Sequence, residues 1–204
     1  MKKERFDLME SVLFVDACMR GAAVSRTHQL CRHFLKEYTA HHPEAQVIHR
    51  DLCREPLPLL TGEMTVQRDH WLEEEPDHPL LNPAREVAEA DLILIGAPYW
   101  DLLFPAALKA YLEWASCRGI TFRYTEEGQQ IGLSRARALV YCTTGGGPVE
   151  GQNYGYHYIK ALAAMFGIPE THCVAAEGLD IWGNDVPAIL ERAEGALTEL
   201  AARL

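Results

Sequence analysis

Apolar residues gather in five short runs along the chain, each about as long as a typical β-strand. The central run, 91–97, does not alternate with polar residues, which indicates a strand buried on both faces of a parallel sheet. Pro98 ends this run, because proline has no N–H to donate to a neighbouring strand. The other four runs predict strands at 11–16, 46–50, 136–142 and 172–176.

Apolar residues at helical spacing separate these runs. Pro105 can occupy the first turn of a helix that continues to Ala115, and Ser25 is placed to cap a helix that ends near residue 41. Further helices are predicted at 82–89, at 159–166 with Gly167 as C-cap, and at 186–204. Strands that alternate with helices predict an α/β fold: a flavodoxin-like, doubly wound, five-stranded parallel sheet with helices on both faces.

Two stretches do not follow this alternation. The polar stretch 61–83, with Trp71 and an acidic run at 73–75, predicts either a short helix with an excursion over the active site or a solvated loop. We favour the solvated loop, because runs of charge are usually solvated. Residues 119–128 alternate between apolar and polar and end at a glycine, which predicts a small hairpin or flap.

Length and net charge limit the functions that the chain can have. With 204 residues, of which 48% are apolar, the chain can bury one substantial core, so we expect residues 1–204 to form a single domain. A net charge of −10 would repel phosphate backbones and argues against nucleic acid as a partner, although a local basic pocket for one small anion remains possible.

The chain lacks the features of an exported or membrane protein. The start, Met1 to Arg5, has the charge of a signal peptide, but the apolar stretch 12–15 behind it is too short. No apolar run is long enough to cross a bilayer. Six cysteines without a C-x-x-C pair favour free thiols, so we expect a cytoplasmic protein and no membrane partner.

Candidate ligand-binding residues follow three of the predicted strands. The loop after the first strand leads to Ser25, Arg26 and Thr27, whose hydroxyls, cation and helix N-terminus suit an anion such as phosphate. An ordinary helix cap remains an equal alternative. Tyr99 and Trp100 follow the central strand, where a flat ligand could lie, although Trp100 could instead pack in the core.

The fourth strand runs into a glycine-rich segment, Thr143, Thr144, Gly145 and Gly146. Glycines at the carboxyl end of a strand let backbone N–H groups come close to a ligand.

Three motifs in this order resemble those of one family. They are Ala97–Asp101 with Phe104–Lys109, then Gly119–Tyr124, then Thr143–Gly146. Together they resemble the flavodoxin-like NAD(P)H:quinone reductase and FMN-dependent azoreductase family. The resemblance implies a homodimer that holds FMN, rather than FAD, without a covalent bond and uses NAD(P)H as co-substrate.

The resemblance also implies a role for each loop. Ser25, Arg26 and Thr27 would hold the FMN phosphate. The isoalloxazine edge would lie along Pro98, Tyr99, Trp100, Asp101 and Leu102. The pyrimidine end would be covered by Thr143, Thr144, Gly145 and Gly146, whose N–H groups would stabilise the negative charge of a reduced flavin.

Two residues depart from the family pattern. Cys18 stands where these azoreductases commonly have serine, which weakens one phosphate donor. Asp101 stands where asparagine is frequent. A carboxylate beside a flavin that gains negative charge is unfavourable, so we expect only the backbone of Asp101 to be useful and its side chain to turn to a donor elsewhere.

His157 is the candidate catalytic residue. It lies fourteen residues after Thr143, the separation at which mammalian-type quinone reductases carry a histidine that assists hydride transfer. It would donate a proton to the reduced quinone. The alternative is a partly buried helix-start residue with a structural hydrogen bond. The other histidines show no ligand spacing with cysteines or acids, so no metal site is expected.

Three functional hypotheses follow. The first is an FMN-dependent NAD(P)H oxidoreductase that reduces small planar acceptors, namely quinones, azo compounds or nitroaromatics, by a ping-pong mechanism. The second is a flavodoxin-type electron-transfer protein that does not oxidise nicotinamide. The third, suggested by Cys18 and Asp101, is a flavin-free relative retained as a binding module.

Overall fold

A five-stranded parallel sheet forms the centre of the computed structural model, which describes residues 10–204. The charged start considered above, Met1 to Arg5, lies outside the described residues. The strand order is β2-β1-β3-β6-β7, and every pairing in the sheet is parallel. The strands are β1 (Ser11–Asp16), β2 (Gln46–Asp51), β3 (Leu92–Gly96), β6 (Ala138–Thr144) and β7 (Glu170–Ala176). This order confirms the predicted doubly wound, flavodoxin-like sheet. The strand β6 begins two residues later than predicted, and β7 begins two residues earlier.

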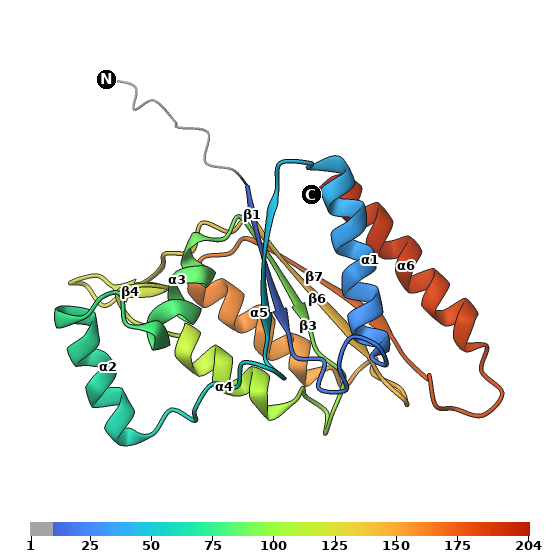
Figure 1. Cartoon of the computed structure of the whole chain (residues 1–204), viewed down its shortest axis with the longest axis horizontal. Helices are drawn as coiled ribbons and strands as arrows, with labels where there is room; N and C mark the ends of the chain where they lie inside the picture. Colours follow the sequence, from blue (N-terminus) through green and yellow to red (C-terminus); the bar gives the residue numbers. More distant parts are fainter. Residues whose placement is uncertain (1–9) are drawn as a thin grey trace.

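Helices cover both faces of the sheet (Figure 1). Helices α1 and α6 lie side by side on one face, and α3, α4 and α5 lie on the other. The helices are α1 (Arg26–His41), α2 (Gly62–Glu74), α3 (Asn82–Glu89), α4 (Ala106–Ala115), α5 (Tyr154–Phe166) and α6 (Val186–Arg203). The short 3-10 helix η1 (Pro79–Leu81) precedes α3. The predicted caps Ser25 and Gly167 are confirmed at the start of α1 and the end of α5.

The central strand shows why an unbroken apolar run was needed. Leu92 and Leu94 face the core under α1 and α6, whereas Ile93 and Ile95 face the core on the other side. Successive side chains of a strand point to opposite faces, so a strand between two helical layers needs apolar residues at every position. The two hydrophobic cores therefore lie on opposite faces of β3. Because β3 pairs with β1 and β6, the loop that follows it lies between the loops that follow those two strands.

The stretch 61–83 differs from the favoured prediction. It forms α2 and η1 rather than a solvated loop. The hydroxyl of Thr61 caps α2 by accepting from the amide of Met64 at 3.2 Å. None of the residues of α2 is fully buried, and Trp71 stacks on His78 with ring centroids 3.7 Å apart. Such a helix lacks a strong apolar stripe, which is why its periodicity gave a weak signal. The predicted hairpin forms from β4 (Phe122–Tyr124) and β5 (Gln130–Gly132).

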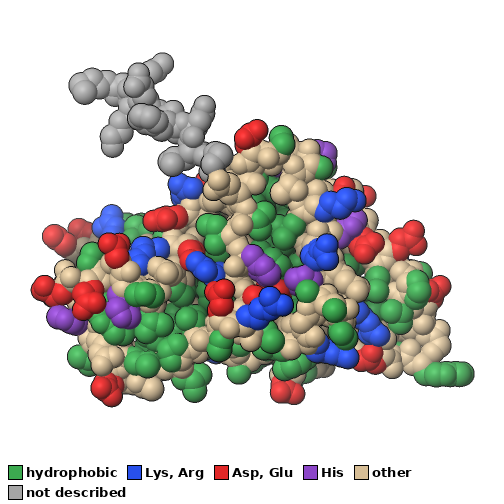
Figure 2. Space-filling view, viewed as in Figure 1, with side chains coloured by type: hydrophobic (Ala, Val, Ile, Leu, Met, Phe, Trp, Pro, Cys, Tyr) green, Lys and Arg blue, Asp and Glu red, His purple; other side chains and the backbone are tan. Residues whose placement is uncertain are grey.

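Charge is distributed unevenly over the surface despite the net charge of −10. On the face shown in Figure 2, acidic side chains are most numerous toward the two ends of the molecule, and several Lys, Arg and His side chains lie together in its middle. Among the described residues, no helix combines the length and the apolar composition required to cross a bilayer.

Candidate active site

A cleft of about 240 Å³ opens at the carboxyl ends of the central strands. Four loops form it, namely those that follow β1, β3, β6 and β7. Most of the predicted site residues line it: Ser25, Arg26, Thr27, Pro98, Tyr99, Trp100, Thr144, Gly145 and Gly146. This edge is where open parallel sheets bind ligands, because the chain diverges there to either side of the sheet.

The N-terminus of α1 forms one wall of the cleft. The hydroxyl of Ser25 accepts from the amide of His28 at 3.2 Å and fixes the first turn. The hydroxyl of Thr27 lies 2.6 Å from that of Thr144, so the first turn of α1 is tied to the end of β6. A helix N-terminus presents free N–H groups and the positive end of the helix dipole, so this wall favours an anion.

Arg26 adds a cation to this wall. One guanidinium nitrogen lies 3.1 Å from a carboxylate oxygen of Asp180 and donates to the carbonyl of Leu179 at 3.3 Å. Sequence reasoning missed Leu179 and Asp180, which line the cleft from the loop after β7. The side chain of Asp180 is largely exposed and that of Arg26 is partly exposed, so the pair is weak and Arg26 can be recruited by a bound anion.

The glycine-rich loop after β6 is held close to the loop after β7. The amides of Leu179 and Asp180 donate to the carbonyls of Gly145 and Gly146 at 3.1 and 2.9 Å. A Cβ on Gly146 would lie 2.4 Å from a carboxylate oxygen of Asp180, and one on Gly145 would lie 2.5 Å from the side chain of Val149. Larger residues at these two positions would therefore force Val149 or Asp180 to move away from this loop.

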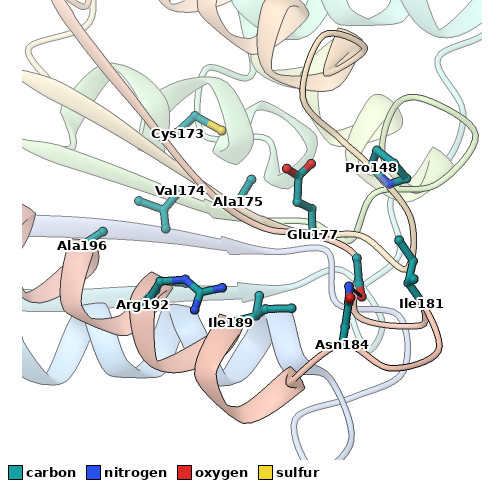
Figure 3. A pocket seen from close by; sticks show the side chains of 12 residues that line it. Pro148, Cys173, Val174, Ala175, Glu177, Ile181, Asn184, Ile189, Arg192 and Ala196 are labelled. Carbon is teal, nitrogen blue, oxygen red and sulfur yellow. Dashed lines mark hydrogen bonds between the residues drawn. The ribbon is translucent and has the colours of Figure 1, made fainter.

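Glu177 holds the rest of the glycine-rich loop. Its carboxylate accepts from the amides of Val149 and Glu150, at 2.8 Å in the case of Glu150. Figure 3 shows Glu177 leaving the end of β7, with Pro148 across the adjoining cavity. That cavity, about 620 Å³, runs along β7 and α6 and is lined by none of the predicted site residues. Burial raises the pKa of Cys173, which lines it, to about 12, so this thiol is protonated at neutral pH.

The loop after β3 forms the third wall. Tyr99 donates its amide to the carbonyl of Thr144 at 2.9 Å, which joins this loop to the end of β6. Trp100 is 45% exposed and lines the cleft, so it is not a core residue. Asp101 and Leu102 have φ angles of 48° and 67° and turn the chain sharply. Asparagine and aspartate tolerate this left-handed region better than most residues, which explains an acidic residue at position 101.

Some predicted residues do not line the cleft. Asp101 and Leu102 are exposed at the tip of their loop. Thr143 is fully buried, because it alternates with Thr144 and faces the other side of β6. His157 is exposed on α5, with its ring edge-to-face with Tyr154 at a centroid distance of 6.4 Å.

Cys18 also lies outside the lining of the cleft. Its side chain is 3% exposed, and its sulfur lies 3.7 Å from the carbonyl oxygen of Gly96. Burial, followed by the nearby carboxylate of Asp16, raises the pKa of this thiol well above its ordinary value. The backbone N–H of Cys18 donates to Asp16 at 3.0 Å. In this arrangement the sulfur of Cys18 is directed into the fold rather than toward a phosphate.

Comparison with known proteins agrees with this geometry. A family model described as a flavodoxin-like fold matches residues 10–201. The chain is 37% identical over 187 residues to FMN-dependent NADH:quinone oxidoreductase 2 of Clostridium acetobutylicum. The aligned region covers 89% of this chain and 93% of the relative. It is 36% identical to an FMN-dependent NADH:quinone oxidoreductase of Coprothermobacter proteolyticus, over 87% of this chain and 91% of the relative. A crystal structure of an azoreductase from Bacillus anthracis superposes with a TM-score of 0.81 at 27% identity and covers 96% of this chain and 100% of its own. The chain therefore belongs to the family with the flavodoxin-like fold that this model describes.

Proposed function

We propose that this protein is an FMN-dependent oxidoreductase that takes hydride from NADH and reduces quinones or azo compounds. The observation that carries the proposal is the cleft at the ends of β1, β3 and β6, where an anion-binding helix start, an aromatic loop and a glycine-rich loop meet. The names of the two bacterial relatives support the same activity and the same cofactor.

The phosphate of FMN fits the α1 wall of the cleft. Ser25 and Thr27 hold the helix start in place, and the first-turn amides and Arg26 would face the phosphate. Asp180 would have to release Arg26 as the phosphate binds. Breaking this solvent-accessible ion pair costs little free energy. Cys18 contributes only indirectly in this proposal, because its sulfur is buried under the loop.

The ring system of FMN fits the other two walls. Bound FMN would supply the redox chemistry, accepting hydride from NADH and passing it to the acceptor. The Gly145 and Gly146 loop lines this part of the cleft without side chains of its own. The amide of Gly145 already donates to the carbonyl of Ala176 at 2.9 Å, so the amide of Gly146 would be the donor to the pyrimidine end. Pro98, Tyr99 and Trp100 would flank the ring, whereas we assign Thr143, Asp101 and Leu102 supporting roles in shaping the loops.

The half-exposed Trp100 favours an enzyme over an electron carrier. It forms a flat apolar wall beside the cleft, as a planar quinone or azo substrate requires. We further propose that His157 donates the proton to the reduced acceptor. It lies in the first turn of α5, and that turn packs on the loop after β3 through Gly155, where a Cβ would lie 3.3 Å from the backbone of Leu103. The side chain of His157 itself is exposed.

The assembly, compartment and domain structure are also proposals. Leu102 and Leu103 are more than 40% exposed beside the cleft, together with Trp100, and a second copy of the chain would bury them, so we propose a homodimer. All six cysteines are free, which suits the reducing cytoplasm. Both cores pack against one sheet, and we therefore propose a single domain over residues 1–204.

Steady-state kinetics with NADH and a soluble benzoquinone test the function. A ping-pong enzyme gives parallel lines in double-reciprocal plots as the quinone concentration is varied, because NADH leaves before the acceptor enters. Intersecting lines would contradict the shared cleft. If NADH is not oxidised at all while the protein still holds flavin, the electron-carrier alternative is favoured.

A further inference from the structure

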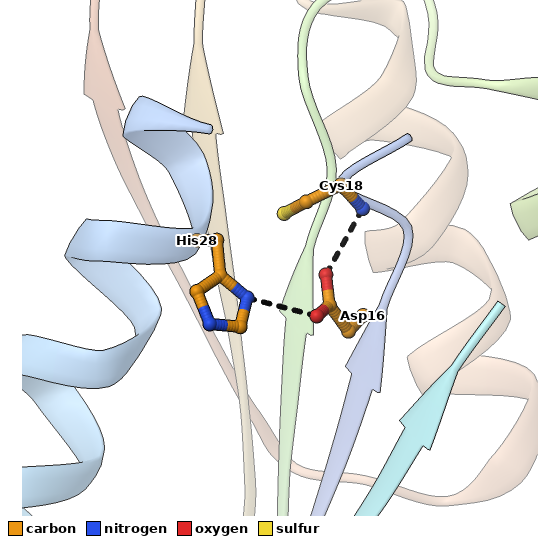
Figure 4. Close-up of side chains that lie close together, drawn as sticks. All are labelled: Asp16, Cys18 and His28. Carbon is orange, nitrogen blue, oxygen red and sulfur yellow. Dashed lines mark hydrogen bonds and ion pairs between the residues drawn. The ribbon is translucent and has the colours of Figure 1, made fainter. Parts of the chain in front are cut away.

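A second cluster of reactive side chains lies beneath the cleft, at the carboxyl end of β1 (Figure 4). Asp16 is the last residue of β1, Cys18 follows in the next loop, and His28 lies in the first turn of α1. All three are at most 5% exposed. One potential ligand atom from each lies within 4.8 Å of the other two. Their separation along the chain did not indicate this grouping, because the turn at the start of α1 brings His28 back over β1.

We propose that Asp16, Cys18 and His28 bind a divalent transition metal of the zinc class. The donor set is one carboxylate oxygen, one sulfur and one imidazole nitrogen, which is typical of zinc. Calcium and magnesium are disfavoured, since each requires about six or more oxygen ligands. The inference is independent of the flavin function proposed above.

The geometry requires only small side-chain movements. Nδ1 of His28 lies 2.8 Å from Oδ2 of Asp16, while Oδ1 of Asp16 is held by the amide of Cys18 at 3.0 Å. Tetrahedral zinc, with bonds of about 2.0 to 2.3 Å, places its ligand atoms roughly 3.3 to 3.6 Å apart. His28 and Asp16 would separate by a few tenths of an ångström, and the sulfur would swing toward them.

The charges balance without a change in redox state. As the metal binds, the S–H bond of Cys18 breaks and its proton passes to solvent. Neutral His28 keeps its remaining proton on Nε2, and Asp16 exchanges its contact with His28 for a bond to the metal. One thiolate and one carboxylate then neutralise a divalent cation, so the buried site carries no net charge.

His49 would support the site from its solvent side. Its Nε2 lies 3.2 Å from the same Oδ2 of Asp16, and its side chain is 42% exposed. Its ring stacks on Phe14 with centroids 4.7 Å apart, which fixes its position on β2. Hydrogen bonds to a ligating carboxylate orient it and commonly change metal affinity by about 10- to 100-fold. Water would take the fourth position on the metal, as in other three-ligand sites.

Cadmium titration of the chelator-treated full chain tests the site, with a phosphine as reductant and no phosphate in the buffer. We expect one equivalent of Cd²⁺ to give a thiolate-to-cadmium absorption band that Zn²⁺ abolishes by competition. Cys18→Ser, which is nearly isosteric, should lose the band. The matched control, Cys53→Ser, removes an exposed thiol and should keep it.

Two further variants guard against misfolding and adventitious binding. His28→Gln should weaken Cd²⁺ binding at least about tenfold, and His49→Gln about 10- to 100-fold, with unchanged circular dichroism spectra. The proposal is overturned if the wild-type chain gives no band at one equivalent. It is also overturned if Cys53→Ser loses the band while Cys18→Ser retains it, because the exposed thiol would then be the ligand.

Discussion

Replacing Arg26 with glutamine should weaken the binding of FMN far more than that of riboflavin, which lacks the phosphate. The side chain of Arg26 is 41% exposed, and its hydrogen bonds within residues 10–204 go to Leu179 and Asp180, so it can turn to a phosphate at little cost. A hydrogen bond to a charged group contributes about 1.5 to 3 kcal/mol. At about 1.4 kcal/mol per factor of ten, Arg26→Gln should raise the Kd of FMN about 10- to 100-fold.

Asp180→Asn should have the opposite effect. Asp180 competes with the phosphate for Arg26 and adds negative charge to the cleft. Exposed ion pairs contribute about 0 to 1 kcal/mol, so this variant should tighten FMN binding by up to about fivefold. Quenching of flavin fluorescence measures both ligands with each variant. An equal loss of riboflavin and FMN affinity in Arg26→Gln, or no loss for FMN, would refute the placement of the phosphate.

Three other substitutions test separate parts of the account. Gly96→Ala should lower the free energy of unfolding by about 1 to 3 kcal/mol, because the new Cβ would lie 2.5 Å from the sulfur of Cys31. In urea denaturation, the double variant with Cys31→Ala should recover part of this loss. If the two substitutions simply added their effects on the free energy of unfolding, the clash would be contradicted. Glu177→Ala should speed hydrogen exchange at the amides of Val149 and Glu150 by about tenfold and should raise the Kd of FMN. Unchanged exchange at these two amides would show that the carboxylate does not hold the loop. His157→Gln should slow quinone reduction about 10²-fold and leave flavin reduction by NADH unchanged; a stopped-flow experiment in which both half-reactions keep their rates would remove His157 from the mechanism.

Local patterns along the chain predicted the scaffold of the site. The unbroken apolar run at 92–96 indicated a strand covered on both faces, and its neighbours in the structure require that pattern. Ser25 was recognised as a helix cap, and Gly145 and Gly146 as a loop that a ligand can approach. Each of these signals depends only on residues within a few positions of one another.

Contacts between distant segments were not predictable in this way. Arg26 and Asp180 are 154 positions apart, and only the pairing of β6 with β7 brings the loop of Asp180 to the cleft. The two threonines at 143 and 144 looked equivalent, but strand alternation directs only Thr144 into the cleft. Cys18 was interpreted by analogy with serine, whereas its sulfur faces Gly96 because the chain turns immediately after β1.

The most direct test of the proposed function is an anaerobic spectrum. The protein is purified without added cofactor, reconstituted with FMN if it is colourless, and mixed with one equivalent of NADH in a sealed cuvette. We expect a flavin absorption band that bleaches on mixing and returns when a quinone is added. Failure of the protein to retain FMN, or a bound flavin that NADH does not bleach, would contradict it.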